Sequence, residues 1–271
     1  MTDNAYFIAT GETDRLRLDI LNKIYNPVAL QFFKKVGLNP GMTVLEFGCG
    51  TGIIACELAK MVGPSGKVIA IDNSEAQLEI ARAHAKALGI THVEFICCDI
   101  ENVDTLKEAF DFCYGRWILE FTKKTPEILK KIYASLKVTG IFTCEVCDVF
   151  DTGYFSVPQV EVVDQWHALM IRNFQSLGLD VHLGHKLFHL LKSLHLQSMT
   201  IEAHQPILVT PEEKIVYRLT LLSGKASILQ RKVISEEAMD SMIQACLSFE
   251  QSDIIVGSIR NLLIAGRKCE E

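Results

Sequence analysis

A glycine-rich stretch over residues 44–52, with the sequence VLEFGCGTG, carries the strongest chemical signal in the chain. It predicts a short buried strand that ends in a carboxylate at Glu46, followed by a tight turn and a helix that opens near Gly52. Glycines let a ligand approach the main chain closely, and the helix directs free N–H groups and the positive end of its dipole into the same space. Such a turn suits a ligand with a carboxylate, a ribose and an adenine.

The glycine spacing separates two nucleotide-binding alternatives. A dinucleotide fingerprint requires Gly-x-Gly-x-x-Gly, whereas the chain has Gly48-x-Gly50-x-Gly52 and places Ile53 in the third dinucleotide slot. This spacing disfavours an NAD-linked oxidoreductase. A P-loop is excluded because no Lys-Ser/Thr pair follows the glycines.

Charged residues follow four successive predicted strands. They are Glu46, Asp72, Asp99 and Arg116. The carboxyl ends of parallel strands meet at one edge of a sheet, which is where open α/β folds bind ligands. Asp72 follows Gly52 by 20 residues, the spacing at which such folds place a carboxylate against ribose hydroxyls. One acid alone is more typical of a helix cap or a solvated loop, but three at one edge favour a binding site.

The elements that position these residues alternate regularly, which predicts a parallel sheet with right-handed crossovers. Further strands are expected at 67–71, 93–97, 110–114, 141–146, 198–203 and 259–267, and helices at 53–61, 74–88, 126–136, 160–178, 186–194 and within 211–249. Near the N-terminus, Asn26 and Pro27 predict that one helix over 15–25 ends and a second begins.

With these positions placed, the chain resembles class I S-adenosylmethionine (SAM)-dependent methyltransferases of the small-molecule type over most of its length, most closely over residues 41–146. The matches are residues 44–52, 71–74 with Gln77, 98–100 and 111–119. The resemblance implies an α/β, Rossmann-like, seven-stranded, mostly parallel sheet with an antiparallel last strand, helices on both faces and an α-helical cap. It divides the chain into an N-terminal helical lid (1–40), a SAM-binding core (41–150), a helical cap insertion (151–183) and the rest of the core (184–271) with a helical insertion at 210–250.

The resemblance also implies site residues. Asp72 is expected to hold the ribose, Asp99 the adenine amino group and Ile100 the adenine ring, with Arg116 facing the methionine carboxylate and the acceptor. The expected cofactor-binding residues are Glu46, Gly48, Cys49, Gly50, Gly52, Asp72, Asn73, Gln77, Asp99, Ile100 and Arg116. Gln77 departs from the family, which often has an apolar residue there. The Asn/Asp-Pro-Pro-Tyr/Phe motif is absent after the fourth strand, which argues against enzymes that methylate nucleobases or glutamine through that motif.

Acceptor binding is expected from the N-terminal segment and from the insertion after the fifth strand. The candidates are Tyr6, Arg15, Asp148, Tyr154, Trp166 and Arg172, with His167 as the candidate general base. Each has an alternative. The N-terminal helix is as readily explained by packing on the sheet, Trp166 by the core, and His167 by a surface or structural position.

Composition narrows the partners. The 271 residues are 49% hydrophobic and 22% charged, typical of a globular enzyme, and the net charge of −6 argues against a nucleic-acid partner. No signal peptide or membrane-spanning run is found, and the nine cysteines fit a reducing compartment, so we expect a cytoplasmic protein. Cys144 and Cys147 would point to opposite faces of a strand, so no metal site is expected.

The predicted function is therefore SAM-dependent methyl transfer to a small organic acceptor, with S-adenosylhomocysteine as the product of the cofactor. Two alternatives remain: a protein or RNA methyltransferase, and a binding or regulatory protein with this fold but without turnover. The net negative charge of the chain and its helical insertions, which could enclose a pocket, favour a small acceptor over a protein or RNA. The acceptor, the methylated atom and the oligomeric state stay open.

Overall fold

A seven-stranded sheet forms the centre of the protein. The computed structural model describes residues 7–106, 109–147 and 153–269. The strand order is β3-β2-β1-β4-β5-β10-β7, and β10 runs antiparallel to both of its neighbours. This confirms the predicted Rossmann-like sheet with an antiparallel last strand. The strands are β1 (Thr43–Phe47), β2 (Lys67–Asp72), β3 (Val93–Cys97), β4 (Phe110–Arg116), β5 (Leu136–Cys147), β7 (Gln197–His204) and β10 (Asn261–Arg267).

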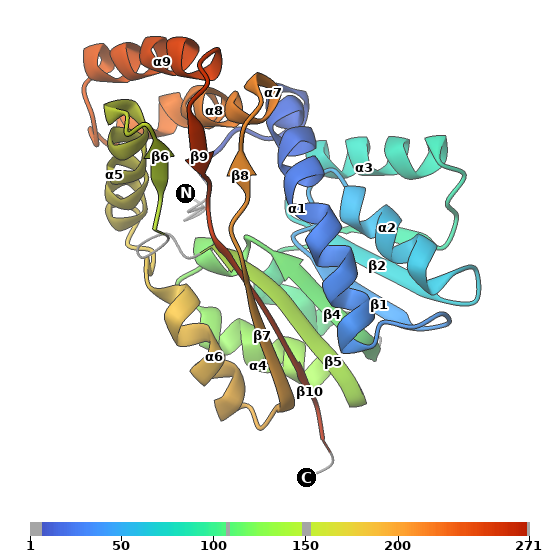
Figure 1. The fold of residues 1–271 in the computed structure, drawn as a ribbon. Helices are drawn as coiled ribbons and strands as arrows, with labels where there is room; N and C mark the ends of the chain where they lie inside the picture. The colour runs from blue at the N-terminus through green and yellow to red at the C-terminus, as the bar shows by residue number, and fades with distance from the viewer. Residues whose placement is uncertain (1–6, 107–108, 148–152, 270–271) are drawn as a thin grey trace.

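Alternating side chains give the sheet two buried faces. In β1, Val44 packs with the helices of one face while Leu45 packs with those of the other, as the two-residue period of a strand requires. Figure 1 shows α1, α2 and α3 on one side of the sheet and α4 and α6 on the other. These helices are α1 (Arg15–Val36), α2 (Ile53–Val62), α3 (Glu75–Ala87), α4 (Thr125–Ser135) and α6 (Leu183–Ser193), and the short 3-10 helices are η1 (Gly11–Asp14), η2 (Ile100–Thr105) and η3 (Leu119–Phe121).

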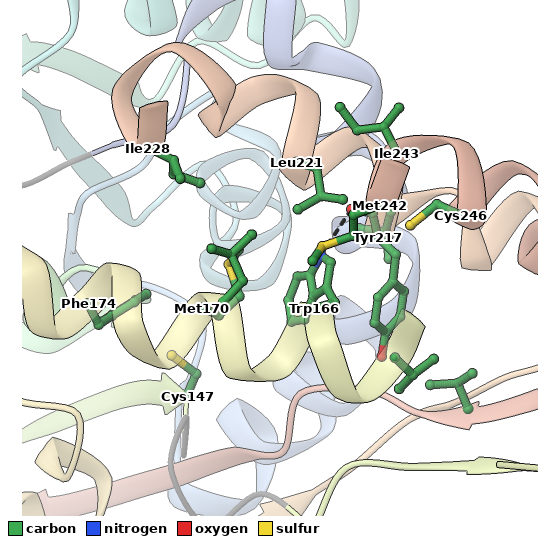
Figure 2. Close-up of a cluster of buried hydrophobic side chains, with 14 of the residues drawn as sticks. Cys147, Trp166, Met170, Phe174, Tyr217, Leu221, Ile228, Met242, Ile243 and Cys246 are labelled. Atoms are coloured by element: carbon green, nitrogen blue, oxygen red, sulfur yellow. Dashed lines mark hydrogen bonds between the residues drawn. The ribbon is translucent and has the colours of Figure 1, made fainter. Parts of the chain in front are cut away.

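A helical cap lies over the carboxyl ends of the parallel strands (Figure 1). It consists of α5 (Glu161–Ser176), α7 (Pro211–Lys214), α8 (Val216–Gln230), α9 (Glu236–Glu250) and a small antiparallel sheet of β6 (Phe155–Val157), β9 (Ile255–Gly257) and β8 (Ile207–Leu208). Figure 2 shows Trp166 and Met170 of α5 directed toward Leu221 and Ile228 of α8. The sequence predicts the cap helices but not this sheet, because strands of two or three residues leave no two-residue period to detect.

The prediction of two N-terminal helices is wrong. Helix α1 runs without a break through Pro27. Pro27 lies on the exposed side of the helix, so the Lys23 carbonyl that loses its hydrogen bond can bond to water instead. Asn26 does not act as a cap, because its buried side chain accepts a hydrogen bond from Arg116.

Other predictions about the chain can be compared with the described residues. All nine cysteines are free thiols, and Cys144 and Cys147 belong to two different hydrophobic clusters. Within residues 7–106, 109–147 and 153–269, no group of His, Cys, Asp and Glu side chains is suited to a metal ion. None of the helices in that part of the chain combines the length and apolarity that crossing a bilayer demands.

The start of α2 yields a stability prediction. Gly52 and Gly63, at the two ends of α2, have φ values of 71° and 69°. A Cβ at Gly52 would lie 2.6 Å from the Cβ and 3.1 Å from the Cα of Ala81 in α3, whereas a Cβ at Gly63 would meet open space. We expect Gly63→Ala to lower the free energy of unfolding by about 1 kcal/mol and Gly52→Ala by about 3 kcal/mol, measured by urea denaturation. Equal losses would contradict the proposed steric role of Gly52.

Candidate functional site

A cavity of about 970 Å³ lies between the carboxyl edge of the sheet and the cap. Its polar side is lined by residues at or after the carboxyl ends of β1, β2, β3 and β4, namely Glu46, Gly48, Cys49, Gly50, Thr51, Asp72, Asn73, Ser74, Gln77, Asp99, Ile100, Glu101 and Arg116. Its opposite side, which we call the apolar chamber, is lined by members of the cap's hydrophobic cluster: Phe7, Ile8, Leu21, Trp117, Phe121, Cys147, Tyr154, Trp166, Met170, Phe174, Val216, Tyr217 and Ile259. The cavity therefore joins a polar edge to an apolar enclosure.

Backbone hydrogen bonds hold the glycine turn against β2. The N–H groups of Gly48 and Cys49 both donate to the Ile71 carbonyl, at 2.8 and 2.9 Å. Gly50 has a φ of 53° and open space beside its Cα, so a ligand can approach the main chain there. Gly52 is not part of the cavity lining and packs against α3 instead.

Asp72 at the end of β2 connects the two loops that line the polar side. Its Oδ2 accepts a hydrogen bond from the Gly50 N–H and its Oδ1 accepts one from the Ser74 N–H, both at 2.9 Å. Burial raises the pKa of this carboxyl, and the backbone hydrogen bonds from Ser74 and Gly50 lower it. Each carboxylate oxygen can accept a second hydrogen bond, so the group remains competent to bind two hydroxyls.

Two buried polar atoms on the same side have no protein partner among the described residues. They are Oε2 of Glu46 and Oε1 of Gln77, and both residues are only 4% exposed. Burial raises the pKa of Glu46 to about 8, against the opposing effect of the nearby Arg116 charge. Buried polar atoms normally have a partner, so these two atoms mark places where a bound ligand can donate hydrogen bonds.

Arg116, at the end of β4, is fixed by helix α1. Its Nη1 donates to Oδ1 of Asn26 at 2.9 Å and its Nη2 donates to Oδ1 of Asn22 at 2.6 Å. Asn22 and Asn26 are four residues apart and so share one face of the helix. The helix therefore sets the direction of the guanidinium in the cavity.

A buried hydrogen-bond network supports the turn after β4. Tyr114 donates to Oε1 of Glu145 at 2.7 Å, and Asn261 donates to Oε2 of Glu145 at 3.0 Å. The indole of Trp117 donates to Oδ1 of Asn261 at 2.9 Å. Trp117 has a φ of 53°, a strained conformation for a residue with a side chain, and the network holds it there.

The N-terminal segment crosses the cavity and is fastened to the cap. The guanidinium of Arg17 donates to both oxygens of Asp14, at 2.7 and 2.5 Å, and Ser223 of α8 donates to Asp14 at 2.7 Å. The Ala9 N–H donates to the Ser223 carbonyl at 3.1 Å. Phe7 packs against Phe174 of α5, with ring centroids 5.9 Å apart. Phe7 and Ile8 of this segment thus line the apolar chamber, and Thr10 also lines the cavity.

The structure brings some of the predicted acceptor residues to the cavity and leaves others away from it. Tyr154 and Trp166 line the apolar chamber. Arg15 is exposed and lies 3.9 Å from Asp19, and Arg172 is exposed on α5. His167 packs against Tyr154 with ring centroids 4.0 Å apart but is not part of the cavity lining. Tyr6 and Asp148 lie outside the described residues.

Several cavity residues were not found from the sequence. Met170 and Phe174 follow Trp166 at four-residue intervals on α5, a helical spacing from which they could have been identified. Tyr217 and Ser258 come from segments far apart in the sequence, and no local pattern marks either one.

Comparison with known proteins identifies the family. A family model described as a methyltransferase domain matches residues 38–192. Demethylmenaquinone methyltransferase of Lactococcus lactis is 32% identical over 135 residues, which are 50% of this chain and 54% of the relative. The chain spans about half or less of the length of the first curated relatives that it matches. The chain belongs to the methyltransferase-domain family.

Solved structures agree on the fold. Phosphoethanolamine N-methyltransferase 2 of Haemonchus contortus, solved with phosphomonomethylethanolamine and S-adenosylhomocysteine, superposes with a TM-score of 0.53 at 18% identity, over 94% of this chain and 52% of that chain. The [4+2]-cyclase SpnF superposes with a TM-score of 0.53 at 17% identity, over 97% of this chain and 98% of that chain. At these identities the likeness shows the class I methyltransferase fold and not the reaction.

The buried carboxyl of Glu46 yields a pH prediction. Its pKa of about 8 lies above the value of about 4.3 for an unfolded chain, so the folded state binds a proton that the unfolded state has lost between these values. The free energy of unfolding is therefore highest below this pH range. It falls as the pH rises toward 8, by up to about 1.4 kcal/mol per pH unit. We expect Glu46→Gln to reduce the fall in melting temperature between pH 5 and 8, measured by calorimetry. The exposed Glu79→Gln is the control and should keep the wild-type profile.

Proposed function

We propose that this member of the methyltransferase-domain family transfers a methyl group from SAM to a small organic acceptor. The observation that carries the proposal is the single cavity that joins the polar carboxyl edge to an enclosed apolar chamber. Its volume of about 970 Å³ is at the upper end of ligand sites. A nucleoside-containing cofactor and a second molecule both fit the chemistry of its two sides.

Residues of the polar side would hold the cofactor. In this proposal, Asp72 accepts hydrogen bonds from the two ribose hydroxyls, and Asp99 accepts one from the adenine amino group. Ile100 packs on the adenine ring. The backbone from Gly48 to Gly50 approaches the methionine portion, whose ammonium group meets the unpaired Oε2 of Glu46. Gln77 offers its unpaired Oε1 as a further acceptor.

The contribution of the chain to methyl transfer is positioning and the exclusion of water. Bound SAM supplies a methyl group on a sulfonium, whose sulfur leaves as a neutral thioether when the acceptor atom attacks the methyl carbon in line. Holding the two molecules in line converts a bimolecular reaction into an effectively unimolecular one. The cap, together with Phe7, Ile8 and Thr10, bounds this space, and the exclusion of water by bound molecules would strengthen the electrostatic effects of Glu46 and Arg116. His167 lies outside the cavity lining, so the proposal gives it no part in proton transfer.

Two other functions remain as alternatives to this proposal. A protein or RNA methyltransferase would need an acceptor site open to a macromolecule, whereas the apolar chamber is bounded by the cap together with Phe7 and Ile8. A binding protein without turnover would retain the cofactor site and form no product. Mass spectrometry of S-adenosylhomocysteine formed from SAM in the presence of candidate acceptors separates turnover from binding alone.

The cofactor assignment predicts the behaviour of one aspartate variant. We expect wild-type protein to bind S-adenosylhomocysteine in calorimetry, and Asp72→Ala to weaken binding about 100-fold, because two charge-assisted hydrogen bonds are lost. Asp111→Ala is the matched control, since Asp111 also accepts a backbone hydrogen bond, from Thr43 at 2.8 Å. Asp111 lies near the start of β4, at the opposite end of that strand from the polar side of the cavity. No binding by wild type, or equal binding by both variants, would overturn the assignment.

The raised pKa of Glu46 predicts proton release on binding. A ligand ammonium near Oε2 favours the ionised carboxyl, so it lowers the pKa from about 8 and expels the proton. We expect the affinity for S-adenosylhomocysteine to rise between pH 6 and 8, and the calorimetric heat at pH 7 to differ between phosphate and Tris buffers. Glu46→Gln should show no such difference. Identical heats in both buffers for the wild type would refute this role of Glu46.

A further inference from the structure

The apolar chamber combines a hydrophobic lining with very little free charge. Eight charged side chains line the cavity within the described residues, and seven of them come from the polar side or from the rim formed by residues 122–124. Arg17 is the exception, and both of its described hydrogen bonds go to the carboxylate of Asp14. Burying an unpaired ion against such a lining is strongly unfavourable. The chamber therefore discriminates against a molecule that would place a net charge inside it.

One polar group in the chamber lacks a well-formed hydrogen bond. The hydroxyl of Tyr217, in the first turn of α8, is buried, finds no partner in regular hydrogen-bond geometry among the described residues, and belongs to a residue that is 2% exposed. Figure 2 shows the ring beside Trp166 with its hydroxyl directed away from α8. Leaving a buried hydroxyl unpaired costs about 1–3 kcal/mol, which a bound molecule with a polar group would recover.

The surrounding side chains hold this hydroxyl in place. The indole of Trp166 donates to the Tyr217 carbonyl at 3.1 Å, and its ring centroid lies 4.8 Å from that of Tyr217. The ring of Phe249 packs edge-on at 5.6 Å from the other direction. The phenol is thus preorganised, and a ligand need not order it on binding.

A second hydroxyl adjoins the first. Ser258 is 5% exposed, lines the cavity and lies close enough to Tyr217 to lower its pKa against the raising effect of burial. The backbone of Ser258 is fixed, because its N–H donates to the Pro206 carbonyl and its carbonyl accepts from Gln205, both at 2.9 Å. Tyr25 donates to the Ile259 carbonyl at 2.8 Å and only at 3.5 Å to the Ser258 hydroxyl, so Ser258 and Tyr217 form a loosely bonded pair of hydroxyls that a ligand hydroxyl can join.

We propose that the apolar chamber binds an uncharged, mostly apolar acceptor that carries a hydroxyl group, and that this hydroxyl bonds to Tyr217 and Ser258. The inference rests on the proposed function only in naming the bound molecule an acceptor, because binding itself does not require turnover. The two protein hydroxyls each donate and accept, so they match a ligand hydroxyl in either role. Carboxylated and phosphorylated compounds are excluded from the chamber by the cost of burying their charge.

Naphthalene, 2-naphthol and 2-naphthoate, which share one ring system, test the inference. Displacement of the fluorescent neutral probe N-phenyl-1-naphthylamine is measured at neutral pH, with and without S-adenosylhomocysteine. We expect 2-naphthol to bind at least about 10-fold more tightly than naphthalene or 2-naphthoate, because it alone is neutral and can bond to both hydroxyls. Binding of 2-naphthoate as tight as that of 2-naphthol, or no displacement by any of the three, would overturn it.

Variants locate the contact. Tyr217→Phe removes one unpaired oxygen, so we expect unchanged or slightly higher thermal stability, about 3- to 10-fold weaker binding of 2-naphthol and no change for naphthalene. Ser258→Ala should act in the same direction, and it provides a second test if Tyr217→Phe fails to fold. Tyr133→Phe, on α4 and outside the cavity lining, is the control and should bind as wild type. Unchanged 2-naphthol binding in both chamber variants would refute the assigned contact.

The same preparations separate this inference from the proposed function. Binding of S-adenosylhomocysteine without discrimination among the naphthalene compounds would overturn the inference and leave the proposed function intact. Selective binding of 2-naphthol without binding of S-adenosylhomocysteine would support the chamber and overturn the cofactor assignment. Failure of both would overturn both.

Discussion

The pair of hydrogen bonds that holds the half-buried guanidinium of Arg116 is the interaction on which the arrangement of the site depends. A cation at the end of a central strand needs hydrogen-bond acceptors, and Asn22 and Asn26 supply them from α1. Those two side chains lie on one helical face, so α1 must stay helical as far as Asn26, and the helix then continues past Pro27. The helix in turn carries Leu21 and Tyr25 into the cap's cluster. One half-buried charge thereby fixes the sheet edge, the helix and the start of the cap relative to one another.

The network of Tyr114, Glu145, Asn261 and Trp117 extends the same logic across the antiparallel strand. Glu145 is in β5 and Asn261 is in β10, so these hydrogen bonds join the parallel part of the sheet to the antiparallel strand that lies between β5 and β7. Trp117 can remain in its left-handed conformation because its indole is bonded to Asn261 and packed against Tyr25, with ring centroids 4.9 Å apart. The turn that separates the polar side from the apolar chamber is therefore held by residues from four elements.

The sequence reveals the parts of the site whose signals are local. The polar side can be predicted from Gly48, Gly50 and the acids at the ends of two buried strands, because each lies at a fixed distance in sequence from a strand end. Tyr217 and Ser258 meet only when α8 and the segment after β9 fold over the sheet, so no spacing marks them. The side of a helix is equally hard to predict when both sides carry mixed residues: Trp166 faces the cavity, while Arg172 on the same helix is exposed. Asn26 and Pro27 mislead because a tertiary bond to Arg116 outweighs their local preference for a helix start.

The two sides of the cavity place opposite demands on what binds there. The polar side leaves Glu46 and Gln77 with unpaired oxygens, so it is completed by a ligand that donates hydrogen bonds. The apolar chamber is completed by a molecule that removes water from aromatic and aliphatic surface and satisfies one hydroxyl. Under the proposed function, SAM would meet the first demand through its ammonium group and a neutral acceptor would meet the second. The proposed contact of Glu46 is with the ammonium group, which methyl transfer leaves in place, so this contact serves the methyl donor and its product alike.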